Sequence, residues 1–164
     1  MALSCCYFFG IAQEKITAEE ARNITATTMA NFTFSTSNAY YKGMSLESFR
    51  AKLCGSAVPM RQGDAMIETA YIYLSKGLTK EEIINVNDGR AVANALQFLS
   101  NQHNKGIVTD GTEIFGGNNI LLRTAFTSKE GCKWYQFWCH VQVFSNWVVE
   151  NWPTILEILS YFGL

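Results

Sequence analysis

Residues 64–99, DAMIETAYIYLSKGLTKEEIINVNDGRAVANALQFL, decide the fold of this chain because they hold three helical patterns separated by short turns. In the first and third patterns, apolar residues recur every three or four positions, which is the spacing of one face of an α-helix. These apolar residues are Met66, Ile67, Ala70, Tyr71 and Leu74 in the first pattern, and Val92, Ala95, Leu96 and Leu99 in the third. The spacing predicts short helices over residues 64–74 and 91–99.

The segments between these helices carry recognisable helix ends. Ser75-Lys76-Gly77 places a cation and then a glycine after the first pattern, as a helix C-terminus prefers. Thr79 and Glu82 have the T-x-x-E spacing of a capping box, in front of the apolar residues of 83–86. Asn87-Asp88-Gly89 is typical of a turn and ends this second helix.

Two further helices are predicted before this region. Thr17 and Glu20 have the spacing of another capping box, and the apolar residues that follow predict a helix that runs to about Asn31. Residues 32–37 either extend this helix or form a short extended piece. A second helix is expected from residue 45 until it stops at Gly55.

The composition is that of one folded domain. The chain has 164 residues, of which 48% are hydrophobic and 16% charged, and its net charge is −1. A length of about 100–200 residues is usual for one domain, and the near-zero net charge argues against a basic nucleic-acid-binding surface. We predict a mainly α fold, a compact bundle of six or seven short helices. A small β-hairpin is expected near residues 107–126, where turn residues gather.

The first twelve residues, MALSCCYFFGIA, resemble the end of a signal peptide. They contain no charge, and Gly10 and Ala12 stand at the −3 and −1 positions of an A-x-A-like cleavage site. The basic residues that begin a signal peptide are missing from them. We interpret residues 1–12 as the remnant of a cleaved signal peptide and 13–164 as a single helical domain, exported to the periplasm or the extracellular space. The alternative is an N-terminal strand or helix packed on the core.

Residues 133–164 are rich in aromatic side chains and predict a C-terminal pair of helices. Pro153 suits the first turn of the final helix. We expect the apolar residues of this helix to be buried or exposed together; they are Ile155, Leu156, Ile158, Leu159 and Phe162. No uncharged stretch of the chain is mainly apolar over the roughly 20 residues of a membrane-spanning helix.

All four tryptophans of the chain belong to this C-terminal pair of helices. They are Trp134, Trp138, Trp147 and Trp152. Because tryptophan favours both protein interfaces and membrane surfaces, they are the candidate residues for a partner-binding or membrane-binding surface. The competing interpretation is that the two helices supply an aromatic core, and the scarcity of Lys and Arg on them favours it.

Cleavage after Ala12 would leave three cysteines. Cys132 and Cys139 can form a disulfide only if Cys132 lies in a loop before the helix, because seven helical positions would hold them about 10 Å apart. The competing interpretation is that all three, Cys54 included, are buried as small apolar residues. We expect no cofactor and no metal, because neither a C-x-x-C nor an H-x-x-x-H pair is present.

These observations favour an exported, non-catalytic protein that binds a macromolecular partner, in a periplasmic interaction or an immunity-type role. We expect a protein partner or a membrane surface, and no nucleic acid. One alternative is a membrane-active effector that inserts its Trp-rich C-terminal tail. Another is a small Cys-dependent hydrolase, in which Cys54 would act with His103 or His140. A cysteine at the end of a helix has a raised pKa, which disfavours this hydrolase.

Overall fold

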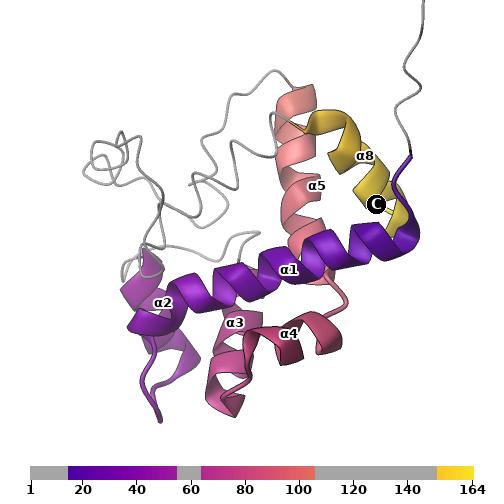
Figure 1. Cartoon of the computed structure of the whole chain (residues 1–164). Coiled ribbons are helices and arrows are strands. Elements are labelled where there is room, and N and C mark those ends of the chain that lie inside the picture. The colour runs from indigo at the N-terminus through magenta and orange to yellow at the C-terminus, as the bar shows by residue number, and fades with distance from the viewer. Residues whose placement is uncertain (1–14, 55–63, 106–150) are drawn as a thin grey trace, which may run out of the picture.

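The computed structural model describes residues 15–54, 64–105 and 151–164, and these ranges are mainly helical (Figure 1). The elements are α1 (Ala18–Thr36), the 3₁₀ turn η1 (Ser37–Ala39), α2 (Leu46–Cys54), α3 (Asp64–Lys76), α4 (Lys80–Val86), α5 (Arg90–Asn104) and α8 (Trp152–Tyr161). No strand occurs within the three ranges, and the predicted mainly α fold is confirmed. The β-hairpin expected near residues 107–126 lies outside them.

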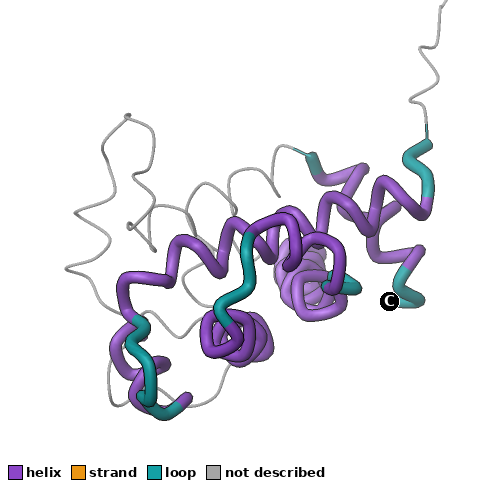
Figure 2. Tube along the Cα trace, turned by 60° about the horizontal axis from the view of Figure 1, so that its bottom comes forward, coloured by secondary structure: helices purple, strands orange, loops and turns teal. Residues whose placement is uncertain are grey.

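The long helix α1 organises the fold. It contacts α3, α4, α5 and α8. In Figure 1 it crosses in front of α3 and α5, with α8 beside its N-terminal half and α2 at its C-terminal end. Figure 2, turned by 60°, looks almost along the helices that pack beneath α1. A helix covered by neighbours on several sides needs apolar residues on more than one narrow stripe.

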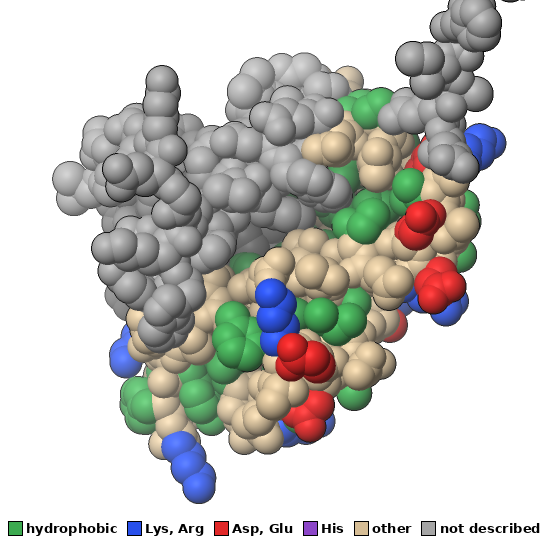
Figure 3. All heavy atoms as spheres, in the orientation of Figure 1, with side chains coloured by type: hydrophobic (Ala, Val, Ile, Leu, Met, Phe, Trp, Pro, Cys, Tyr) green, Lys and Arg blue, Asp and Glu red, His purple; other side chains and the backbone are tan. Residues whose placement is uncertain are grey.

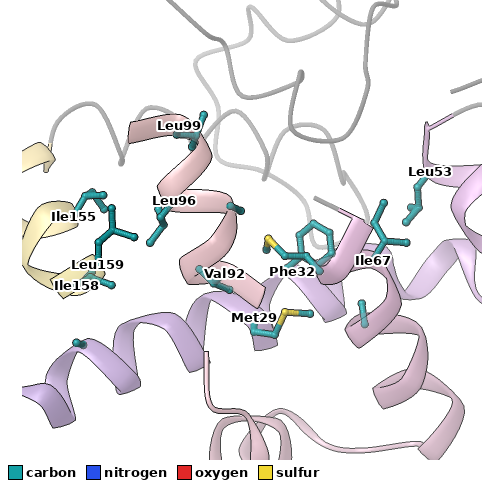
Figure 4. Close-up of a cluster of buried hydrophobic side chains, with 14 of the residues drawn as sticks. Met29, Phe32, Leu53, Ile67, Val92, Leu96, Leu99, Ile155, Ile158 and Leu159 are labelled. Carbon is teal, nitrogen blue, oxygen red and sulfur yellow. The ribbon is translucent and has the colours of Figure 1, made fainter. Parts of the chain in front are cut away.

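The core is a single cluster of buried apolar side chains from α1, α2, α3, α5 and α8 (Figure 4). The predicted apolar faces are largely confirmed, with Tyr71 and Leu74 partly buried against the cluster and the other predicted residues of α3 and α5 fully buried. Figure 4 shows Leu96 of α5 next to Leu159 of α8, and Met29 and Phe32 of α1 on the other side of α5. Helix α5 therefore joins the C-terminal helix to the rest of the core.

Both predicted capping boxes are present. The Thr17 N–H donates to a Glu20 carboxylate oxygen at 2.6 Å, and the Glu20 N–H donates to the Thr17 hydroxyl at 3.1 Å. Thr79 and Glu82 make the same pair of bonds at the start of α4, at 2.8 and 3.3 Å. The hydrogen bonds from the threonine backbone and side chain favour the ionised carboxylate, so they lower the pKa of Glu20 and of Glu82.

Helix α1 continues to Thr36, five residues beyond the end expected at Asn31. Four hydroxyl side chains of α1 are buried, and each donates to a carbonyl three or four residues earlier; they are Thr25, Thr33, Ser35 and Thr36. Such a bond satisfies the hydroxyl inside the helix, so the side chain can be buried without an outside partner. This local bonding allows a stretch rich in Ser and Thr to be buried in a central helix.

The turn between α4 and α5 brings its backbone directly against α1. Gly89, which ends the predicted turn, is buried and has a φ of +76°. A Cβ atom at Gly89 would lie 1.9 Å from Oγ1 and 2.5 Å from Cβ of Thr25. Glycine is therefore required here twice, for the left-handed backbone and for the close approach.

Candidate interaction surface

Helix α8 divides its apolar residues between the core and the surface. Ile155 and Ile158 are fully buried, and Leu159 is nearly so. Leu156, which belongs to the same apolar run, is 47% exposed. The expectation that these residues would be buried or exposed together is therefore wrong, because α8 packs on the core with one face while its other face carries apolar residues too.

The exposed side of α8 and of the residues that follow it is mainly apolar. Tyr161 is 46% and Leu164 39% exposed, in addition to Leu156, and Pro153 is exposed in the first turn. We call these four residues the α8 surface. The other large apolar side chains that are exposed among the described residues are distributed over α1, α3, α4 and the loop after η1; they are Phe34, Tyr41, Ile72 and Val86. Among the described residues, α8 and the residues after it thus hold three of the seven large exposed apolar side chains within nine positions of the sequence.

The only charge on α8 is already engaged. Glu157 accepts a hydrogen bond from the backbone N–H of Ile16 at 3.0 Å. The Tyr161 hydroxyl donates to the backbone carbonyl of Ile16 at 2.5 Å. Helix α8 therefore binds both the backbone N–H and the backbone carbonyl of Ile16, just before α1 begins. We call this pair of hydrogen bonds the Ile16 clamp.

The C-terminal end of α8 is closed by a Schellman motif. The N–H of Leu164 donates to the Leu159 carbonyl at 3.1 Å, and the N–H of Gly163 donates to the Ser160 carbonyl at 3.3 Å. Gly163 has a φ of +71°, as this motif requires. The motif fixes the backbone of Leu164, so that the last residue of the α8 surface belongs to the ordered end of the helix.

None of the four residues of the α8 surface was a candidate site residue in the sequence analysis. Of the four candidate tryptophans, Trp152 lies at the start of α8, partly buried against the core, while Trp134, Trp138 and Trp147 lie outside the described residues. The possible disulfide between Cys132 and Cys139 also lies outside them. Sequence reasoning did not single out Ile16, Tyr161 or Leu164 as candidate site residues. The one usable signal was Glu157, a single charge in an otherwise uncharged helix.

Cys54 lies at the end of α2, in a setting that suppresses the thiolate. Burial raises the pKa of the Cys54 thiol to about 11, although the nearby Arg50 guanidinium acts in the opposite direction. His103 belongs to the last turns of α5. Figure 4 places Leu53, the neighbour of Cys54, on the far side of Phe32 and Ile67 from Leu99 of α5. The described core thus separates the end of α2 from the end of α5, and His140 lies outside the described residues.

An ion pair joins α2 to the first turn of α3. Nε of Arg50 lies 2.7 Å from one carboxylate oxygen of Asp64, and a second guanidinium nitrogen lies 3.3 Å from the other oxygen. Both side chains are mostly buried, at 17% and 12% exposure. A two-point contact of this kind orients the guanidinium as well as pairing its charge, so this cluster positions α2 against α3.

The described residues contain no group of three or more His, Cys, Asp or Glu placed to hold a metal ion. Among the same residues, no helix combines the length and the apolar character needed to cross a membrane. The face in Figure 3 shows acidic and basic side chains intermixed, without a large block of one sign.

Comparison with protein-family models, with curated proteins and with solved structures finds no match to this chain.

Proposed function

We propose that this chain is an exported, non-catalytic helical protein that binds a protein partner through the α8 surface. The observation that carries the proposal is the exposure of Leu156, Tyr161 and Leu164 on one short stretch, next to a core that is otherwise well covered. Exposed apolar groups that gather in one place on a soluble domain are typical of interaction sites.

The α8 surface has the rigidity that a binding site needs. Ile155 and Ile158 fix the inner face of the helix in the core, and the Ile16 clamp fixes its orientation. Because Glu157 is engaged with the backbone of Ile16, a partner would meet few polar groups that need a counterpart. An apolar partner surface that carries an aromatic or aliphatic anchor fits these properties.

Export is compatible with this arrangement. Cleavage after Ala12 would leave Gln13 as the first residue, so Ile16 and both of its bonds to α8 would be kept. The mature chain would begin three residues before the clamp. The proposed signal peptide can therefore be removed without loss of the contacts that hold the α8 surface.

The two other functions have less support. Insertion of α8 into a membrane would take Ile155, Ile158 and Leu159 out of the core, and it would expose to water the apolar side chains of α1 and α5 that they cover. A Cys-dependent hydrolase needs a thiolate near neutral pH. The raised pKa of Cys54 instead keeps its thiol protonated near neutral pH.

Site-specific photo-crosslinking in the cells that make the protein tests the proposal. A photoreactive residue is placed at position 156 in one variant and, as a matched control, at position 86 in another. Val86 is 62% exposed against 47% for Leu156, so accessibility alone would favour the control position. We expect a discrete adduct with a second protein from position 156 and none from position 86.

The adduct should disappear when Leu164→Ser is added to the chain that is labelled at position 156, because this change removes part of the α8 surface while leaving the core intact. Labelling with equal yield at positions 156 and 86, or no adduct at all, would overturn the proposal. An adduct of twice the mass of the chain would identify the partner as a second copy of this protein.

A further inference from the structure

We propose that Asn23 and Asn31 on α1 are acceptor sites for N-linked glycans. Each begins an N-x-T tripeptide, Asn23-Ile24-Thr25 and Asn31-Phe32-Thr33, and these are the only two N-x-[ST] tripeptides in the chain. The inference rests on the export part of the proposed function, because the transferase that recognises this tripeptide acts on chains entering the secretory pathway. The inference therefore requires that the chain is exported through a eukaryotic secretory pathway.

The folded structure leaves both asparagines free to carry a bulky group. Asn23 and Asn31 are exposed, although most of α1 is covered by other helices. Their positions differ by eight residues, so they lie about 12 Å apart along the helix axis. A glycan at either position would project into solvent and would displace nothing in the core.

The hydroxyl residues of the two tripeptides are placed differently from the asparagines. Thr25 and Thr33 are buried, and each hydroxyl donates to a carbonyl four residues earlier, of Ala21 and of Met29, at 2.9 Å in both cases. A transferase must reach this hydroxyl to recognise the tripeptide, and in the folded chain it cannot. Glycan transfer therefore precedes the folding of α1. Folding then buries the two threonines, while the modified asparagines remain exposed to solvent.

The chemical step is a group transfer from a lipid-diphosphate-linked oligosaccharide. A bond forms between the Asn side-chain nitrogen and C1 of the first sugar, and the bond between C1 and the diphosphate oxygen breaks. The amide nitrogen loses one proton, and the lipid diphosphate leaves with the bonding electrons. No oxidant or reductant is needed.

The glycans would cover a region that has little charge of its own. No charged residue occurs between Arg22 and Lys42, a stretch that includes most of α1. Figure 3 shows mainly uncharged surface (tan and green) along the middle of α1. Two large polar groups on this helix would raise the solubility of an exported chain that has a net charge of only −1.

Cell-free translation with endoplasmic-reticulum microsomes tests the inference. The chain is translated in two forms, from its own Met1 and behind a supplied cleavable signal peptide, and each product is treated with peptide-N-glycosidase. Cleavage of the supplied signal shows that the chain has entered the lumen. We expect two mobility steps that the glycosidase removes, one lost in Asn23→Gln, one lost in Asn31→Gln and both lost in the double variant.

Asn38→Gln is the matched control, because Asn38 is also an exposed asparagine close to the end of α1 but begins no N-x-[ST] tripeptide. It should leave both steps in place. A chain that enters the lumen behind the supplied signal and shows no glycosidase-sensitive step overturns the acceptor sites and leaves the binding proposal intact. Glycans behind the supplied signal but not from Met1 uphold the two acceptor sites and overturn export directed by residues 1–12 alone.

Discussion

At Gly89 the backbone of the α4–α5 turn lies so close to α1 that no side chain fits between them. We predict that Gly89→Ala destabilises the protein far more than Gly77→Ala. Both glycines have positive φ, +76° and +67°, so both changes carry the cost of a left-handed alanine, about 1–2 kcal/mol. At Gly89 the new Cβ would also overlap Thr25, which adds about 1–3 kcal/mol of overpacking. Urea denaturation of the two variants measures the difference.

Gly77 is a close control because it has nothing within 4 Å of its added Cβ. The two variants therefore share the backbone strain and differ in the overlap. If both lose the same free energy of unfolding, the contact between Gly89 and Thr25 is not the one that the structure describes.

The pKa of Cys54 leads to a second prediction at the scale of one residue. Its ordinary value is 9.0 and burial raises it to about 11. At about pH 8 the thiolate fraction should then be about 100-fold lower in the folded chain than in the unfolded chain. We expect alkylation of Cys54 by iodoacetamide to be slow in buffer and fast in concentrated urea, as quantified by mass spectrometry of the peptide that contains Cys54.

The pH dependence distinguishes a raised pKa from simple shielding of the thiol. In the folded protein the alkylation rate should keep rising until about pH 11, whereas in urea it should level off near the ordinary pKa. A folded-state rate that levels off at the same pH as in urea contradicts the raised pKa.

At the scale of a helix, α8 offers a comparison between its two faces. We predict that Ile158→Ala lowers the free energy of unfolding by about 2–5 kcal/mol, because it leaves a cavity in the core. Leu156→Ala on the same helix should cost less than about 1 kcal/mol, since Leu156 is 47% exposed. Denaturation curves of the two variants test whether α8 is part of the cooperative core.

Trp152 reports on the same question because it lies at the start of α8, partly buried against the core. If α8 were a detachable membrane-inserting tail, vesicles would shift the tryptophan emission of the wild type, and Ile158→Ala would hardly change the stability of the remaining fold. Equal and small effects of the two alanine changes would therefore favour the membrane-active alternative.

Helix α1 shows which features of an element can be predicted from its sequence. The start of α1 is determined locally by Thr17 and Glu20, whose side chains bond within four residues, and it was predicted. The end at Thr36 agrees with only one of the two alternatives for residues 32–37, because alternating Thr and Ser residues also resemble a short extended piece. The burial of Thr25 and Thr33 depends on neighbouring helices, which a helical period in one segment cannot reveal.

At the scale of the whole molecule, the least predictable feature is the Ile16 clamp. Ile16 is separated from Glu157 by 141 positions and from Tyr161 by 145. No periodic pattern relates residues so far apart, and a backbone N–H or carbonyl has no sequence signature. The α8 surface was missed for the same reason. Its orientation depends on the packing of the opposite face of α8 in the core and on the Ile16 clamp. The mainly α fold was accessible because caps and apolar periods act within single helices.

The clamp leads to a prediction that involves both ends of the described chain. We expect Tyr161→Phe to cost about 0.5–1.5 kcal/mol in a chain that begins at Gln13, because it removes only the hydroxyl that donates to the Ile16 carbonyl. In a chain that begins at Ala18, Ile16 is absent and the same change should cost nothing. Loss of the Thr17 cap lowers the stability of both shorter chains equally, so it cancels in this double-mutant cycle. An equal cost of Tyr161→Phe in the longer and the shorter chain would show that the Tyr161 hydroxyl does not act through Ile16, and that the N-terminal segment does not orient the α8 surface.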